Sequence, residues 1–192
     1  MISKLFSDCP VLEGLTIDGG IRAKEVLNFM ISAPKLKTLQ ISLSVDNPHY
    51  VYNLSIDAPM LENLDIELDI VANCVLESAK SLVKANIALD GCIGEQRPAF
   101  SNCATALLAQ VRNLTYLSLS ASCFEAGDLP SFNNLKQLKL VLYDCYYSEL
   151  LAEVLKRSAN LKDLFLDAYS HVLQGSCYIA LGAMASAFAH ER

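Results

Sequence analysis

Leucine and isoleucine recur along this chain in one short pattern. Leu12, Leu15 and Ile17 give the form L-x-x-L-x-L, in which the last two apolar residues stand two apart. An extended strand turns two such positions to the same face. The form returns at Leu36/Leu39/Ile41, Leu61/Leu64/Ile66, Leu114/Leu117/Leu119, Leu135/Leu138/Leu140 and Leu161/Leu164/Leu166, with weaker copies at Val51/Leu54/Ile56 and Leu82/Ala85/Ile87.

The distance between copies predicts a stacked repeat fold. Most steps between strong copies, with the Leu82 copy included, are 21 to 26 residues, within the roughly 20 to 29 of leucine-rich repeats. One strand cannot bury its apolar face alone, but strands stacked in parallel make a continuous leucine core. We therefore predict an α/β leucine-rich-repeat solenoid over residues 1–173, a curved parallel sheet with helices and loops on the convex side.

The segments between the copies predict helices and loops on the convex side of the solenoid. Apolar residues at helical spacing predict helices over 22–31, over 102–111 with Asn102 as the cap, and over 148–157. Proline and glycine predict loops around 46–50 and 91–100. The period is broken twice, because the Val51 copy lies only ten residues before Leu61 and the step from Leu82 to Leu114 is 32 residues. We expect an irregular solenoid there.

The tail over 174–192 predicts an amphipathic helix. Its apolar side chains include Ile179, Leu181, Met184 and Phe188. An open solenoid needs its last repeat covered, so we favour a capping role over partner binding. The apolar run from 178 to 189 is shorter than the roughly 20 residues that span a bilayer, and we expect no membrane association.

Composition and charge narrow the function classes. Apolar residues make up 53% of the chain and charged residues 19%, which fits a well-buried fold. The formal net charge is −6 and the lysines and arginines are scattered, so we expect no nucleic-acid partner. Seven cysteines without a C-x-x-C pair predict reduced, buried thiols. The N-terminus has no secretory signal, and we expect a cytoplasmic or nuclear protein.

The chain offers little for catalysis. His49, His171 and His190 are far apart, and no metal-binding or phosphate-binding motif occurs. We expect no enzyme activity, no metal and no cofactor. A hydrolase or transferase stays open only if catalytic groups converge in space.

The repeats carry a cadence that points to one family. Residues 33–41 and 58–66 share the form A-P-x-L-x-x-L-x-I, with variants starting at Cys9 and Ala159. This resembles the repeat region of plant F-box/leucine-rich-repeat proteins, especially the FBD-type group, over about 9–167. The resemblance implies an F-box that docks on the Skp adaptor of a cullin ubiquitin ligase while the repeats present a substrate. No F-box segment precedes these repeats and no FBD segment follows Asp167, so we expect a fragment, a truncated product or a free-standing repeat protein.

The residues that alternate with the buried leucines define a concave face. The expected central row is Thr16, Gln40, Ser55, Asp65, Asn86, Ser118, Lys139 and Phe165. One flanking row is Gly14, Thr38, Asn53, Asn63, Lys84, Tyr116, Gln137 and Asp163. The other is Asp18, Ser42, Asp57, Glu67, Ala88, Ser120, Val141 and Asp167.

A solenoid face of this kind typically binds another protein. Our candidate contact residues are Thr16, Gln40, Asp65, Glu67, Asn86, Tyr116, Ser118, Lys139 and Phe165. Tyr116 and Phe165 are the preferred anchors, and an acidic patch of Asp18, Asp57, Asp65 and Glu67 could steer a basic segment. We expect a substrate-recognition region of an F-box-type ubiquitin ligase, with the Skp adaptor as partner only if a longer form carries an F-box. The alternative is an intracellular repeat scaffold unrelated to ubiquitin transfer.

Overall fold

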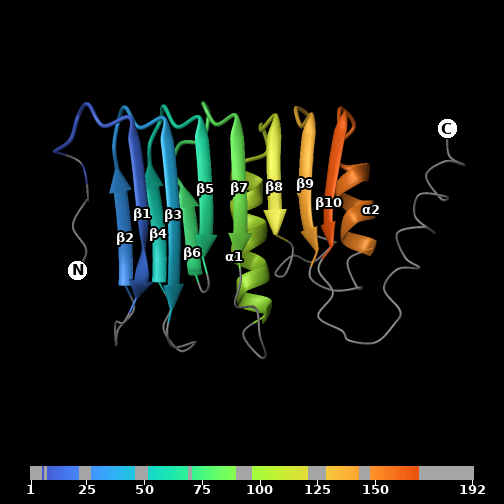
Figure 1. Ribbon diagram of the computed structural model, residues 1–192, viewed down its shortest axis with the longest axis horizontal. Helices are drawn as coiled ribbons and strands as arrows, with labels where there is room; N and C mark the ends of the chain where they lie inside the picture. Colours follow the sequence, from blue (N-terminus) through green and yellow to red (C-terminus); the bar gives the residue numbers. More distant parts are fainter. Residues whose placement is uncertain are drawn as a thin grey trace, which may run out of the picture.

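The fold consists of two layers of secondary structure that lie face to face. The computed structural model describes residues 6, 8–21, 27–45, 52–68, 71–89, 97–120, 129–142 and 148–168. Within them, seven parallel strands form one sheet (Figure 1). In spatial order they are β1 (Gly14–Ile21), β3 (Thr38–Val45), β5 (Asn63–Leu68), β7 (Lys84–Leu89), β8 (Tyr116–Ser120), β9 (Gln137–Leu142) and β10 (Asp163–Ala168). The predicted leucine-rich-repeat solenoid is confirmed.

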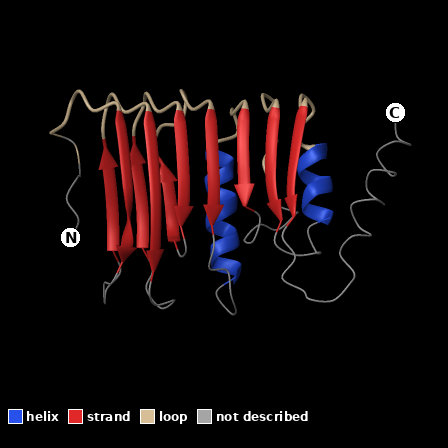
Figure 2. Ribbon diagram, in the orientation of Figure 1, coloured by secondary structure: helices blue, strands red, loops and turns tan. Residues whose placement is uncertain are grey.

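The second layer lies behind the first and changes character along the solenoid (Figure 2). It begins as a parallel sheet of β2 (Leu27–Ser32), β4 (Tyr52–Asp57) and β6 (Val71–Leu76), and continues with helices α1 (Arg97–Gln110) and α2 (Ser148–Lys156). At the change, the Gln110 side chain of α1 accepts the Leu76 N–H at 2.5 Å, so a helix side chain satisfies a backbone donor of β6.

The core lies between these layers and consists of side chains in register. Ile41 pairs with Ile66 and Ile66 with Ile87 across adjacent strands, and all three are buried. Leu119 and Leu140 continue the same row. Ile31, Leu54 and Cys74 face them from the second layer. Each repeat thus covers the apolar face of its neighbour, as the leucine spacing requires.

The A-P-x-L cadence forms the turn that starts each repeat. The Ala33 carbonyl accepts the Leu36 N–H at 3.2 Å, and the Ala58 carbonyl accepts the Leu61 N–H at 3.0 Å. A bond from residue i to i+3 defines a β-turn, and proline favours its second position because its φ is fixed there. The same bond joins Cys9 to Leu12, Ala79 to Leu82, Val111 to Leu114, Phe132 to Leu135 and Ser158 to Leu161.

One carbonyl of each repeat then holds the next repeat in register. The Glu13 carbonyl accepts the N–H groups of both Lys37 and Thr38, at 2.8 and 3.0 Å. The carbonyls of Lys37, Glu62, Val83, Thr115 and Lys136 do the same for the repeats that follow them. We call this line of turns, at which the seven strands begin, the strand-start edge.

The helix expected over 22–31 is wrong where the structure describes it. Residues Leu27–Ser32 form strand β2, which pairs with β4. Leu27, Phe29 and Ile31 also alternate with period two, so the segment fits both periods, and pairing with β4 decides for the strand.

The Val51 copy is not a repeat of the main sheet. Its residues 52–57 form β4 in the second sheet, and residues 71–76 form a further strand there, β6, which the leucine pattern does not predict. The ten-residue step from Val51 to Leu61 is therefore not a full repeat. It is the part of one solenoid turn that leads from the second sheet to the main sheet. Asn53, Ser55 and Asp57 leave the predicted rows for this reason.

The other two predicted helices are present, and one of them begins earlier in the sequence than predicted. The helix predicted over 148–157 is confirmed as α2. Helix α1 begins at Arg97, so Asn102 lies inside it and is no cap, and residues 97–100 are helical where a loop was expected. Pro98 is compatible with this start because proline is tolerated in the first turn of a helix. The loops expected over 46–50 and 91–96, and the tail helix over 174–192, lie outside the described residues.

Two cysteine side chains are described, and they differ. Cys74 is a buried thiol in the core, as expected, whereas the Cys9 thiol is exposed in the first turn. The expectation of buried thiols is therefore wrong for Cys9.

Leu138 and Leu164 are register partners in β9 and β10 and give a matched test of the core. Leu138 is fully buried, whereas Leu164 is 38% exposed on the last described strand. We expect Leu138→Ala to lower the free energy of unfolding by about 2–5 kcal/mol, and Leu164→Ala to lower it by less than half as much. Urea unfolding followed by circular dichroism measures both. Equal losses would contradict the exposure of Leu164.

Candidate functional site

The candidate site is the open face, defined as the side of the seven-stranded sheet turned away from β2, β4, β6 and the helices. The register places its residues in straight rows across the strands. The central row runs Thr16, Gln40, Asp65, Asn86, Ser118, Lys139, Phe165, with each residue paired to the next. The structure therefore brings seven of the nine candidate contact residues into one line.

The flanking rows are equally continuous and hold the other two candidates. Tyr116 lies in the row of Gly14, Thr38, Asn63, Lys84, Gln137 and Asp163. Glu67 lies in the row of Asp18, Ser42, Ala88, Ser120, Val141 and Asp167. Asn53, expected on this face, instead donates a hydrogen bond to Asn28 at 2.7 Å on the second sheet.

Exposure separates the nine candidates into three groups. Thr16, Gln40, Glu67, Asn86 and Phe165 are exposed, and Asp65, Tyr116 and Lys139 are half-buried. Ser118 is in the row but only 6% exposed, and its neighbour on the same face, Ser120, is buried too. Short serine side chains lie low between longer neighbours, so Ser118 forms the floor of the face and offers a partner little contact area.

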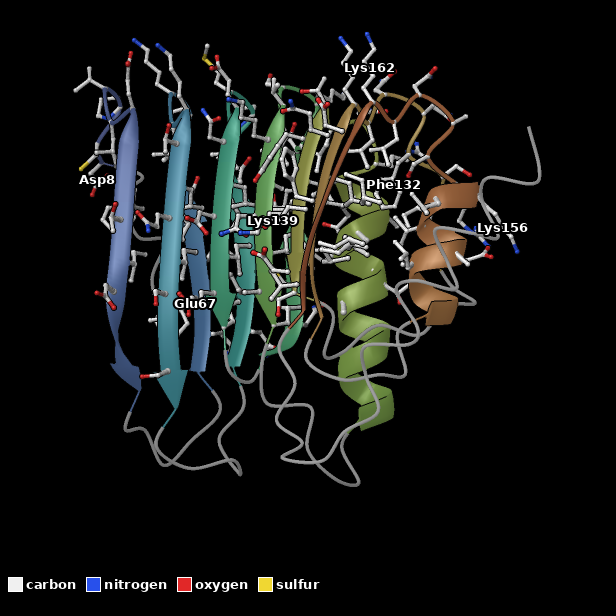
Figure 3. All side chains as sticks on the ribbon, turned by 45° about the vertical axis from the view of Figure 1, so that its right-hand side comes forward. Asp8, Glu67, Phe132, Lys139, Lys156 and Lys162 are labelled. Atoms are coloured by element: carbon white, nitrogen blue, oxygen red, sulfur yellow. The ribbon has the colours of Figure 1, made fainter. Side chains whose placement is uncertain are left out.

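Polar pairs cross the strands on this face. Asn86 donates to the Asp65 carboxylate at 2.8 Å, and Gln137 donates to that of Asp163 at 3.0 Å. Lys139 Nζ lies 2.8 Å from Asp167 Oδ2. Figure 3 shows the Lys139 side chain projecting from the open face, while Phe132 points into the core between sheet and helices. Such cross-strand pairs order the polar side chains while leaving them at the surface.

Aromatic side chains lie at one end of the open face, whereas carboxylates lie at both ends, with Asp163 and Asp167 on β10. Asp18, Asp65 and Glu67 make the part over β1 to β5 acidic, as expected, although Asp57 is on the second sheet and does not contribute. The aromatic side chains Tyr116 and Phe165 stand on β8 and β10. Phe165 is 53% exposed beside Lys139, its register partner. A large apolar side chain exposed within a polar face is a typical feature of a protein contact surface.

The sequence predictions do not include one surface feature. A hollow of about 320 Å³ lies on the strand-start edge at β8 to β10, lined by Asn113, Thr115, Asn133, Asn134, Lys136, Asn160 and Lys162. The signal was present, because asparagine precedes the first leucine of the repeat, and threonine or lysine follows it, in the last three copies. This signal lies in the turns between repeats, whereas the predicted rows follow from the alternation within the strands.

The described residues include neither a metal-binding group nor a membrane span. Across the described part of the chain, no three or more His, Cys, Asp or Glu side chains are placed to hold a metal ion. Among its helices, none has the length and apolar character to cross a membrane.

Comparison with known proteins found relatives among plant repeat proteins. An F-box/LRR-repeat protein of Arabidopsis thaliana is 32% identical over 175 residues, which cover 85% of this chain and 40% of that protein. A putative F-box/FBD/LRR-repeat protein of the same plant is 31% identical over 172 residues, 88% of this chain and 37% of its own length. A second F-box/LRR-repeat protein is 28% identical over 184 residues, covering 92% of this chain and 39% of its own.

The chain therefore spans about two fifths of the length of these relatives. No family model and no solved structure matches it.

The Lys139–Asp167 ion pair gives a test of how firmly the open face is ordered. Both side chains are about 40% exposed, so solvent screens the pair. We expect a double-mutant cycle with Lys139→Met and Asp167→Asn to give a coupling energy below about 1 kcal/mol. Urea unfolding of the four proteins measures it. A coupling of several kcal/mol would mean that the pair is a structural element and not an adaptable part of a contact surface.

Proposed function

Because this chain is a repeat region of the plant F-box/leucine-rich-repeat type, we propose that it recognises a protein substrate for a cullin ubiquitin ligase through its open face. The observation that carries the proposal is the exposed Phe165 within a polar face of paired, in-register side chains. Such a face supplies contact area at the aromatic positions and orientation at the polar ones.

The partner we propose is a folded or extended protein segment with apolar and basic side chains. Its apolar side chains would pack on Phe165 and Tyr116, the aromatic side chains of the open face. Its basic side chains would lie toward β1 to β5, where Asp18, Asp65 and Glu67 are exposed or half-buried. Complementary charge of this kind sets the orientation of a partner and speeds its association.

The chain itself binds and does not catalyse in this proposal. The link to ubiquitin transfer rests on the relatives, whose names include an F-box. An F-box in a longer form of the protein would bind the Skp adaptor, and the repeats would bring the substrate to the ligase. We place this activity in the cytoplasm or the nucleus.

Proximity labelling with the wild-type chain in plant cells identifies partners for a direct test. We expect the double variant Tyr116→Ala, Phe165→Ala to bind the recovered partner at least about tenfold more weakly, since buried aromatic anchors each contribute about 2 kcal/mol or more. The control is Val11→Ala, Met60→Ala, which removes two exposed apolar side chains from the strand-start edge. Affinities of purified proteins are compared by calorimetry.

Two outcomes would count against the proposal. If the double variant keeps the affinity of the wild type for every partner, the open face is not the contact surface. If the longer form binds partners through this face but never co-purifies with a Skp adaptor, the chain is a repeat scaffold outside ubiquitin transfer.

A further inference from the structure

The hollow on the strand-start edge is built from the same positions of three successive repeats. Asn113, Asn134 and Asn160 precede the first leucine of their repeats, and Thr115, Lys136 and Lys162 follow it. The repeat geometry therefore places the three asparagine amides in one row. A second row beside it contains the threonine hydroxyl and the two lysine ammonium groups. Figure 3 shows Lys162 at this edge, away from the open face.

The backbone beneath the hollow is held firmly. The Thr115 carbonyl accepts the N–H groups of Lys136 and Gln137 at 2.9 and 3.1 Å, and the Lys136 carbonyl accepts those of Lys162 and Asp163 at 2.8 and 3.0 Å. The Asn160 side chain donates to the Asn133 carbonyl at 2.6 Å, which ties the two turns that border the hollow. The lining side chains thus stand on a preorganised base, which lowers the entropy lost on binding.

This part of the edge carries mostly positive charge. Residues 80–84, 112–116, 133–137 and 159–163 carry five cationic side chains, Lys80, Lys84, Arg112, Lys136 and Lys162, and one anionic side chain, Asp163. The Asp163 carboxylate accepts the hydrogen bond from Gln137. At the other end of the edge, residues 9–14, 33–38 and 58–63 carry two of each sign, and Lys37 is paired with Glu13 at 3.1 Å.

Lys136 and Lys162 are both exposed, and within the described residues neither ammonium group has an ion-pair partner. No acidic side chain lines the hollow. In a chain with net charge −6, two exposed lysines beside four asparagines make a local site for an anion.

We propose that this hollow binds the carboxylates of an acidic protein segment, a run of aspartate and glutamate on a partner. One carboxylate lies between the ammonium groups of Lys136 and Lys162, and the asparagine amides donate to a second carboxylate or to the carbonyls of the segment. A volume of about 320 Å³ holds one or two such side chains. This surface is separate from the open face, and the inference does not depend on substrate binding there.

A peptide fits the lining better than a nucleic acid does. Recognition of a single strand relies on aromatic side chains on which bases stack, and the hollow is lined by asparagine, threonine and lysine alone. Amide side chains instead pair well with the carbonyl and carboxylate oxygens of a peptide.

The test uses the full chain and a fluorescein-labelled hexaglutamate peptide at low ionic strength. We expect Lys136→Glu, Lys162→Glu to weaken the anisotropy-measured affinity by at least about tenfold, since two surface ion pairs are lost and reversed. The matched control is Lys35→Glu, Lys156→Glu, which changes the net charge equally at exposed lysines outside the hollow. A second pair, Lys136→Gln, Lys162→Gln, replaces the first if the reversed variant does not fold by circular dichroism.

Wild-type and control proteins should bind alike, and their affinity should fall as salt screens the charges over about 10 Å at 0.1 M. The proposal is overturned if hexaglutamate does not bind, or if the hollow and control variants lose affinity equally. It is also overturned if a ten-nucleotide oligothymidylate binds more tightly than the peptide with the same dependence on Lys136 and Lys162. Loss of open-face binding in the Tyr116 and Phe165 variant would leave hexaglutamate binding unchanged, so the two proposals fail independently.

Discussion

Burial of in-register apolar rows between two layers is the interaction on which the rest of the structure depends. Ile41, Ile66 and Ile87 lie in one row across three strands, and each is enclosed by its neighbours and by the second layer. Removal of this apolar surface from water favours only arrangements that keep the rows aligned, because a slip by one residue would turn every inward side chain outward. The shared carbonyls of the strand-start edge reinforce the same register.

The two candidate surfaces are consequences of this alignment. Since inward positions are fixed, the residues between them form straight rows on the open face, where Asn86 meets Asp65 and Lys139 meets Asp167. The same alignment stacks the turns, so asparagines and lysines at equal positions come together in the hollow. Repetition thus converts single, scattered side chains of the sequence into continuous surfaces.

The main sheet and its face could be predicted from the sequence because both follow from local alternation. The spacing of Leu36, Leu39 and Ile41 identifies the positions that face the core. The residues between them must then face outward. The second layer could not be predicted from local alternation. Residues 27–32 satisfy helical and strand periods alike, and only pairing with β4, far along the chain, selects the strand.

Other features depended on contacts that no local pattern contains. Asn53, Ser55 and Asp57 alternate like a repeat of the main sheet but belong to β4, which pairs with β2 and β6. The ten-residue step before Leu61 was the available signal, since it is too short for a full turn of the solenoid. The burial of Ser118 depends on the size of its neighbours on adjacent strands, and the hollow depends on comparing turns across repeats.

In this fold Gln40 lies between Thr16 and Asp65 in the main sheet, whereas Ser55 belongs to the second layer. A nuclear Overhauser spectrum of the isotopically labelled chain tests this most directly, because adjacent strands lie about 4.8 Å apart. We expect cross-strand signals from the backbone of Gln40 to the strand segments around Thr16 and Asp65, and none to Ser55. Signals from Gln40 to Ser55, or an antiparallel pattern between these strands, would contradict it.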